Sequence, residues 1–228
     1  LVADPEVDVV YINSPNNWHY SQAKLALEAG KAVLCEKPFT LNAHELRDLI
    51  EIARQRKTFL MEAMWVRYLP MVVKLRELLS AKSLGEIRLV RASFHTQLPF
   101  APEGRIYNLA LGGGSLLDLG IYPISLASMV MGGPPAAISS QAKIGATGVD
   151  EHFGAVFHYE DGRMATVSAG VDGKYAEDVV IHGSRGSLRT PPWKFGRFTL
   201  EKKTGEVETV ELPAAGGGYV YQAQEVMR

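Results

Sequence analysis

The sequence predicts an α/β unit followed by an α+β unit: one half of a doubly wound parallel sheet, and then a mainly antiparallel sheet domain with helices on one face. Three observations support this. Residues 1–64 alternate short apolar runs of strand length with helical patterns. From Gly85 onward, several runs alternate apolar and polar residues with the period of two that half-buried strands have. An apolar helix flanked by glycines, from about Ser115 to Met131, interrupts those strands.

The first unit, residues 1–64, is expected to hold three parallel strands joined by two helices. The expected strands are Asp8–Ile12, Ala32–Cys35 and Thr58–Met64. Gly30 is placed to end the first helix, and Thr40 or Asn42 to begin the second. Such alternation builds a parallel sheet with right-handed crossovers. No G-x-G-x-x-G run precedes a helix near the start, so we expect the C-terminal half of a Rossmann-type sheet without its Gly-rich first strand–helix unit.

The second unit, residues 65–228, begins with an amphipathic helix from Met71 to Ser80. The sheet strands expected after it are Gly85–Thr96, Ala136–Ile144, Glu151–Tyr159, Arg163–Gly170 and Asp178–His182. Residues 160–163 (Glu-Asp-Gly-Arg) are typical of a tight hairpin between two of these strands. A sheet with helices on one face needs cover for the other, so we expect a homodimer formed through this second sheet.

Composition and charge exclude several classes of protein. A formal net charge of -1 gives no basic surface for nucleic acid or an anionic membrane, which leaves a small molecule as the expected partner. A membrane span needs roughly 20 apolar residues, and we expect no stretch of this chain to meet that requirement. The single cysteine, Cys35, lies inside an apolar strand, so we expect an inert buried thiol and a reducing, cytoplasmic location.

The two ends of the chain look internal to a longer protein. The chain begins at Leu1 without an initiator Met and closes inside a helical pattern. We therefore expect both the first unit and the C-terminus to be incomplete, with an export signal still possible upstream of Leu1.

Lys37 is the first candidate for chemistry. The run Ala32–Thr40 is apolar until Glu36, Lys37 and Pro38 end it, and in open α/β sheets ligands bind beyond the carboxyl ends of the strands. The alternative is a surface lysine beside a structural proline. Which of the two holds depends on what else lies near this strand end.

Asp118 and Tyr122 are the second candidates. They are four residues apart, which places both on one face of the expected helix. Tyr122 beside Lys37 would form an acid/base pair, because a nearby ammonium stabilises the phenolate and lowers the pKa of the tyrosine toward neutral pH. Taken singly, Asp118 could instead serve a helix start and Tyr122 could be a buried tyrosine with a satisfied hydroxyl.

Four segments carry a resemblance to a known family: GKAVLCEKPFTL, VVYINSPNNWH, MEAMWVRYLP and GGGSLLDLGIYPISLAS. Together they resemble the Gfo/Idh/MocA family of NAD(P)-dependent oxidoreductases, over about residues 4 to 190. Tyr122, and Trp65 after Glu-Ala-Met, are similar to the branch of dihydrodiol dehydrogenase, glucose-fructose oxidoreductase and D-xylose dehydrogenase. The resemblance implies NAD or NADP as cofactor, with the branch favouring NADP, and a sugar or cyclic diol as substrate.

The resemblance also implies roles for single residues. Lys37 would bind the reacting oxygen, Tyr122 would transfer the proton, and Asp118 would orient the pair. The residues implied to contact the nicotinamide and its ribose are Ser14, Pro15, Asn16, His19, Glu36 and Lys37. Trp65 would wall the substrate cleft together with Tyr122, and Arg67 would reach cofactor or substrate. The resemblance makes residues 65–228 the substrate-binding and dimerisation domain.

Other interpretations stay open. Trp65 could be core between the units, and His19 could simply begin a helix. The remaining histidines lack metal-ligand spacing, so no metal site is expected. Gly112–Gly114 and Gly216–Gly218 are interpreted as turns. For the whole chain, the alternative to hydride transfer is a non-catalytic fragment or ligand-sensing remnant that no longer binds a dinucleotide.

Overall fold

The first unit contains a three-stranded parallel sheet in the computed structural model, which describes residues 1–175, 178–191 and 196–228. The strands β1 (Val9–Ile12), β2 (Ala32–Glu36) and β3 (Leu60–Ala63) lie in the order β1-β2-β3. Ile12 aligns with Cys35, and Glu36 with Ala63. All three strands run in the same direction, so their carboxyl ends share one edge of the sheet, as expected.

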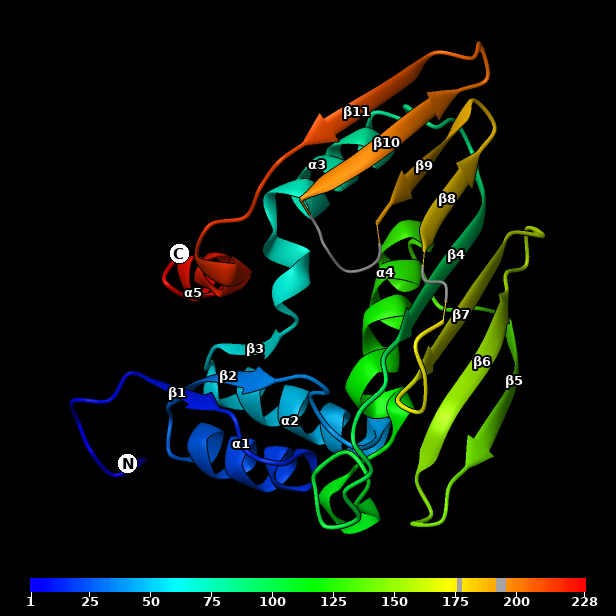
Figure 1. The fold of residues 1–228 in the computed structure, drawn as a ribbon. Coiled ribbons are helices and arrows are strands. Elements are labelled where there is room, and N and C mark those ends of the chain that lie inside the picture. The colour runs from blue at the N-terminus through cyan, green and yellow to red at the C-terminus, as the bar shows by residue number, and fades with distance from the viewer. Residues whose placement is uncertain (176–177, 192–195) are drawn as a thin grey trace.

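Two helices cover one face of this sheet (Figure 1). Helix α1 (His19–Glu28) is followed by Gly30, whose φ of 76° suits the left-handed turn that ends a helix. Helix α2 (Ala43–Arg56) begins at Asn42, whose side chain accepts bonds from the backbone nitrogens of His44 and Glu45. Their buried residues form one apolar cluster with β1 and β2.

The second unit is built on an eight-stranded sheet in the order β11-β10-β9-β8-β4-β7-β6-β5. The strands are β4 (Ile87–His95), β5 (Ala137–Ile144), β6 (Asp150–His158), β7 (Met164–Gly170), β8 (Val179–Gly183), β9 (Gly186–Thr190), β10 (Arg197–Lys202) and β11 (Val207–Glu211). Every pair is antiparallel except β4–β7, which is parallel. The expected fold class, a Rossmann-type half followed by a mainly antiparallel sheet with helices, is confirmed.

The sequence interpretation missed three strands, β9, β10 and β11. They are only five or six residues long, and β11 (Val-Glu-Thr-Val-Glu) is almost entirely exposed at the sheet edge. Short strands with few buried positions show only a weak alternation of apolar and polar residues. They form because they pair with neighbouring strands, which the sequence pattern does not report. Past β11 the chain returns to the junction of the two units, where α5 (Tyr219–Val226) packs against the turn Trp65–Tyr68 that follows β3 (Figure 1).

The interrupting helix has two parts rather than one. A π-helical turn, Leu116–Gly120, precedes α4 (Ile121–Met131), which packs on β4 and β7. The carboxylate of Asp150 on β6 fixes the start of this segment by accepting 2.6 Å bonds from Ser115 Oγ and the Leu116 backbone nitrogen. Gly120 is required there, because a Cβ would lie 2.4 Å from the Phe153 ring. π-Helical turns are frequent at functional sites.

The expectation that no window is apolar enough to span a membrane was wrong. Residues Leu109–Met131 have the length and composition of a span, with a mean hydropathy of 1.4, and 61% of the relevant window is buried inside the fold. Packing of α4 on the second sheet accounts for this composition, since a helix that is apolar on most sides is buried in protein or in lipid. Helix α3 (Pro70–Ser80) completes the elements near this core.

Candidate active site

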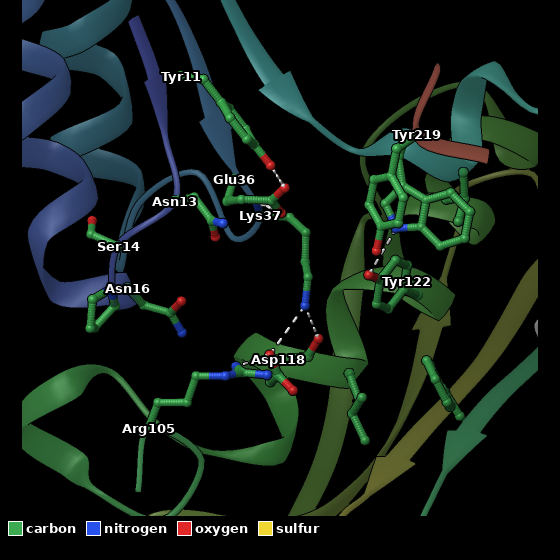
Figure 2. A pocket seen from close by; sticks show the side chains of 15 residues that line it. Tyr11, Asn13, Ser14, Asn16, Glu36, Lys37, Arg105, Asp118, Tyr122 and Tyr219 are labelled. Atoms are coloured by element: carbon green, nitrogen blue, oxygen red, sulfur yellow. Dashed lines mark hydrogen bonds and ion pairs between the residues drawn. The ribbon is translucent and has the colours of Figure 1, made fainter. Parts of the chain in front are cut away.

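A cleft of about 660 Å³ lies where the carboxyl ends of β1 and β2 face the π-helical turn before α4. Its first wall is the loop after β1 and the end of β2, and its second wall comes from α4, β4 and α5 (Figure 2). The lining residues are Tyr11, Asn13, Ser14, Pro15, Asn16, Glu36, Lys37, Trp65, Val66, Phe94, Arg105, Asp118, Leu119, Tyr122 and Tyr219. The two units therefore build this site jointly.

Lys37 crosses the cleft to Asp118. Its Nζ lies 2.7 Å from the backbone oxygen of Asp118 and 3.1 Å from Oδ1 of the same residue, and both side chains are largely buried. Arg105 approaches the same Oδ1 from the cleft mouth, with Nη1 at 2.6 Å and a side chain that is 59% exposed (Figure 2). One carboxylate thus holds two cations in place.

These cations keep Asp118 ionised. Burial alone would raise the pKa of Asp118, but the Lys37 ammonium and the Arg105 guanidinium outweigh burial and hold the pKa below its ordinary value. A carboxylate in this state only accepts hydrogen bonds. Asp118 therefore fixes the position of the lysine and cannot itself serve as a proton donor at neutral pH.

Tyr122 differs from the sequence expectation. Its pKa is raised to about 12, mainly because the ring is buried, and the charges of Asp118 and Glu36 act in the same direction. Lys37 Nζ lies over the ring, 4.9 Å from its centroid, and donates its hydrogen bonds to Asp118. Trp65 Nε1 donates to the phenolic oxygen at 3.2 Å. The expectation that the lysine lowers this pKa toward neutrality was wrong, and Tyr122 is a neutral phenol at neutral pH.

The β1 side of the cleft has the features of a polar ligand site. Ser14 Oγ is buried and makes no hydrogen bond among the described residues. Glu36 accepts a short hydrogen bond from the Tyr11 hydroxyl, and burial followed by that bond raises the pKa of Tyr11 above its ordinary value. Asn16 Nδ2 donates to Gly112 O at 2.8 Å, which ties this loop to the second unit. The unsatisfied Ser14 hydroxyl fits a polar ligand group such as a nicotinamide amide or a ribose hydroxyl.

Two residues expected at the site lie elsewhere. His19 is completely buried, and its ring nitrogens lie 2.7 Å from Pro38 O and 2.9 Å from Ser14 O. It holds the two strand-end loops together and is not among the residues that line the cleft, so its contact with a cofactor stays a prediction. Arg67 lines a separate cavity with Arg76 between the ends of α3 and α4.

The structure also adds residues that the sequence interpretation did not identify. Arg105 lies in a loop without any periodic pattern, and its spacing from Asp118 carries no helical signal. Tyr219 reaches the cleft from α5, and its ring stacks on Trp65 with a centroid distance of 4.9 Å. Tyr11 lies at an exposed position of β1, whose residues alternate between exposed and buried. This alternation is the one signal in the sequence that could have placed its side chain outside the core.

Comparison with known families and proteins gives a consistent result. Residues 1–64 match the oxidoreductase family with an NAD-binding Rossmann fold, and residues 72–189 match the GFO/IDH/MocA C-terminal domain. The trans-1,2-dihydrobenzene-1,2-diol dehydrogenase of Sus scrofa is 37% identical, covering 99% of this chain and 70% of the relative. The D-xylose 1-dehydrogenase (NADP(+)) of Hypocrea jecorina is 33% identical, covering 100% of this chain and 66% of the relative.

Solved structures share the fold. An aldose-aldose oxidoreductase from Caulobacter crescentus, complexed with glycerol, aligns with a TM-score of 0.87 at 23% identity, over 98% of this chain and 68% of its own. A 3-ketoreductase from Actinomadura kijaniata, in complex with NADP, aligns with a TM-score of 0.84 at 28% identity, over 99% of this chain and 70% of its own.

The Asp118→Asn substitution tests the buried ion pair. At pH 7 we expect a loss of about 3 kcal/mol in the free energy of unfolding, because Lys37 loses its anionic partner in a buried site. The folded-state pKa of Asp118 lies below the ordinary value of 3.8, so its contribution is complete above pH 3.8 and is lost as the pH falls through the folded pKa. The difference between wild type and variant should therefore shrink below pH 4, as measured by urea unfolding.

Asp48→Asn is the matched control, since Asp48 pairs with Lys24 at the surface. Water screens that pair, and its removal should change the unfolding free energy far less. An equal loss in both variants, or a difference for Asp118→Asn that does not change with pH, would contradict the assignment.

Proposed function

This chain belongs to the GFO/IDH/MocA oxidoreductase family, and we propose that its cleft transfers a hydride between NAD(P) and a CH–OH group of a sugar or cyclic diol, with Lys37 and Tyr122 handling the proton. The chain is an NAD(P)-dependent oxidoreductase by its family. One observation carries the assignment of residues: Lys37, at the end of β2, meets Asp118 one turn before Tyr122 in a cleft formed by both units.

Lys37 is placed to bind the reacting oxygen. An ammonium has three N–H donors, and Asp118 takes two of them among the described residues. The third can reach a substrate oxygen in the cleft. The positive charge would stabilise negative charge that develops on that oxygen, which is the electrostatic role that preorganised donors play in catalysis.

Tyr122 is placed to transfer the proton. Since its pKa is about 12, it holds a proton at neutral pH and can give it to the oxygen of a carbonyl that is being reduced. In the reverse direction the phenolate takes the proton from the hydroxyl of the substrate. The bound cofactor supplies the hydride acceptor or donor at the nicotinamide ring.

The residues of the β1 side fit the nicotinamide half of the cofactor. Ser14, Pro15 and Asn16 line the cleft next to Glu36, and the Ser14 hydroxyl needs a partner. We propose that these four residues hold the nicotinamide and its ribose. The NADP named for the Hypocrea jecorina relative supports NADP as the cofactor, in line with the sequence resemblance.

The second wall fits a cyclic polyol. Trp65 and Tyr219 present stacked rings, and Phe94 lies 5.6 Å from the Tyr122 ring, centroid to centroid. Aromatic rings suit the apolar face of a pyranose or cyclic diol, while Asp118 and Arg105 suit its hydroxyl groups. The substrates named for the relatives, a cyclic diol and D-xylose, support this proposal, and the comparisons do not support a non-catalytic remnant.

We further propose a homodimer through the face of the second sheet opposite α4. Figure 1 shows α4 on one face only, and on the other face lie the polar side chains Arg91, Thr166, Ser168 and Asp178. A second copy would cover this face by packing sheet on sheet, as the two layers of a β-sandwich do.

Tyr122→Phe and Lys37→Met test the proton transfer. Each should lower kcat by about 10²- to 10⁴-fold, the usual contribution of general acid–base catalysis, in assays of D-xylose and trans-cyclohexane-1,2-diol with NADP and NAD. Tyr159→Phe is the matched control, since Tyr159 is as buried as Tyr122 and its hydroxyl makes no hydrogen bond among the described residues. Full activity of Tyr122→Phe would overturn the assignment.

Light scattering after gel filtration tests the dimer. A mass near twice 25.0 kDa is expected at micromolar concentration. Thr166→Arg on the open face should give the monomer, whereas Thr209→Arg on the edge strand β11 should not change the mass. A wild-type monomer would contradict the proposal.

A further inference from the structure

We propose that Trp65 is a positioning residue for Tyr122, held in place by the backbone of Gly218, and that its indole N–H stabilises the ionised form of the tyrosine. This inference rests on the proposed role of Tyr122 as the proton-transfer group. It gives Trp65 a second task beside walling the cleft, and it gives a structural purpose to the glycine run Gly216–Gly218, which the sequence interpretation treated as a turn.

The contact between the two side chains is direct. Trp65 Nε1 lies 3.2 Å from the phenolic oxygen of Tyr122, and an indole nitrogen can only donate. Such a bond becomes stronger when the acceptor oxygen carries a charge, so it favours the phenolate. Lys37 is not in an equivalent position, because its Nζ lies over the ring of the tyrosine.

The charged groups around Tyr122 make this donor important. Burial of the ring disfavours the phenolate most, the charges of Asp118 and Glu36 disfavour it further, and Arg105 favours it. The Lys37 ammonium donates a hydrogen bond to Asp118, and Tyr219 of α5 lies near enough to Tyr122 to interact with it electrostatically. A neutral donor on the phenolic oxygen lowers the cost of ionisation without adding charge to the cleft.

The C-terminal segment fixes the indole. The Tyr219 ring stacks on Trp65 with a centroid distance of 4.9 Å and an interplanar angle of 30°. The backbone of Gly218 approaches so closely that a Cβ there would lie 2.8 Å from Trp65 Cζ3 and 2.7 Å from Leu69 Cδ2. Only glycine permits this approach, so any larger residue must push the indole or Leu69 aside.

The Trp65→Phe substitution removes the N–H and keeps an aromatic ring. Its first readout is the titration of Tyr122 in the full chain labelled with [ζ-13C]tyrosine, with the signal assigned by Tyr122→Phe. The onset of ionisation, followed up to pH 11, should move to higher pH, with about tenfold less phenolate present at a given pH. This readout does not depend on enzyme activity.

The second readout is the rate of alcohol oxidation between pH 7 and 10 with D-xylose and NADP. In Trp65→Phe, kcat should fall about tenfold at each pH in this range, because less phenolate is available to accept the proton. A role as cleft wall alone would raise KM and leave both kcat and the tyrosine titration unchanged, which would overturn the proposal.

Comparing Gly218→Ala with Gly217→Ala distinguishes the effect of a steric contact with Trp65 from the effect of backbone strain in the loop. Both glycines have positive φ, 94° and 68°, but a Cβ on Gly217 meets nothing within 4 Å. Gly218→Ala should move the onset of Tyr122 ionisation to higher pH and lower kcat, while Gly217→Ala should leave both as in wild type. Equal effects of the two substitutions would overturn the role of Gly218.

Failure of the proposed function gives a different result. If Tyr122→Phe keeps full activity, Tyr122 is not the proton-transfer group. The titration of Tyr122 in Trp65→Phe would still measure the hydrogen bond, so the two proposals can fail separately.

Discussion

The ion pair between Lys37 and Asp118 joins the two units of this chain. Lys37 lies at the carboxyl end of β2, where a parallel sheet places its ligands, and Asp118 lies in the π-helical turn that precedes α4. Both side chains are removed from water, so each charge depends on the other. Tyr122 lies one turn further along the same segment, so the ion pair and the tyrosine line the same cleft.

A glycine and a partly buried carboxylate hold the start of the segment that leads into α4. Asp150 accepts the bonds of Ser115 Oγ and the Leu116 nitrogen, and Gly114 makes room for it, since a Cβ would lie 2.2 Å from Asp150 Oδ1. The second sheet therefore positions one wall of the cleft through β6, while Asn16 and the backbone of Gly112 connect the other wall to it. The geometry of the site is set by contacts between segments far apart in the sequence.

This explains which parts could be predicted from the sequence. Lys37 was predicted because an apolar strand ends in a charged residue. Asp118 and Tyr122 were predicted because they are four residues apart. Both features are local patterns in the sequence. Arg105 and Tyr219 reach the cleft from a loop and a distant helix, and no local pattern reports such contacts. The direction of the Tyr122 pKa shift was wrong for the same reason: burial and the aim of the lysine toward Asp118 depend on tertiary packing.

The central claim is that the Lys37–Asp118 pair assembles a site for the nicotinamide end of a cofactor. Titration of the chain with NADPH and NADH, followed by cofactor fluorescence, tests it most directly. The account predicts saturable binding that NADP or NAD displaces, and weaker binding by Asp118→Asn, in which Lys37 loses its fixed position. Absence of binding by the wild type, or equal binding by the two proteins, would contradict it.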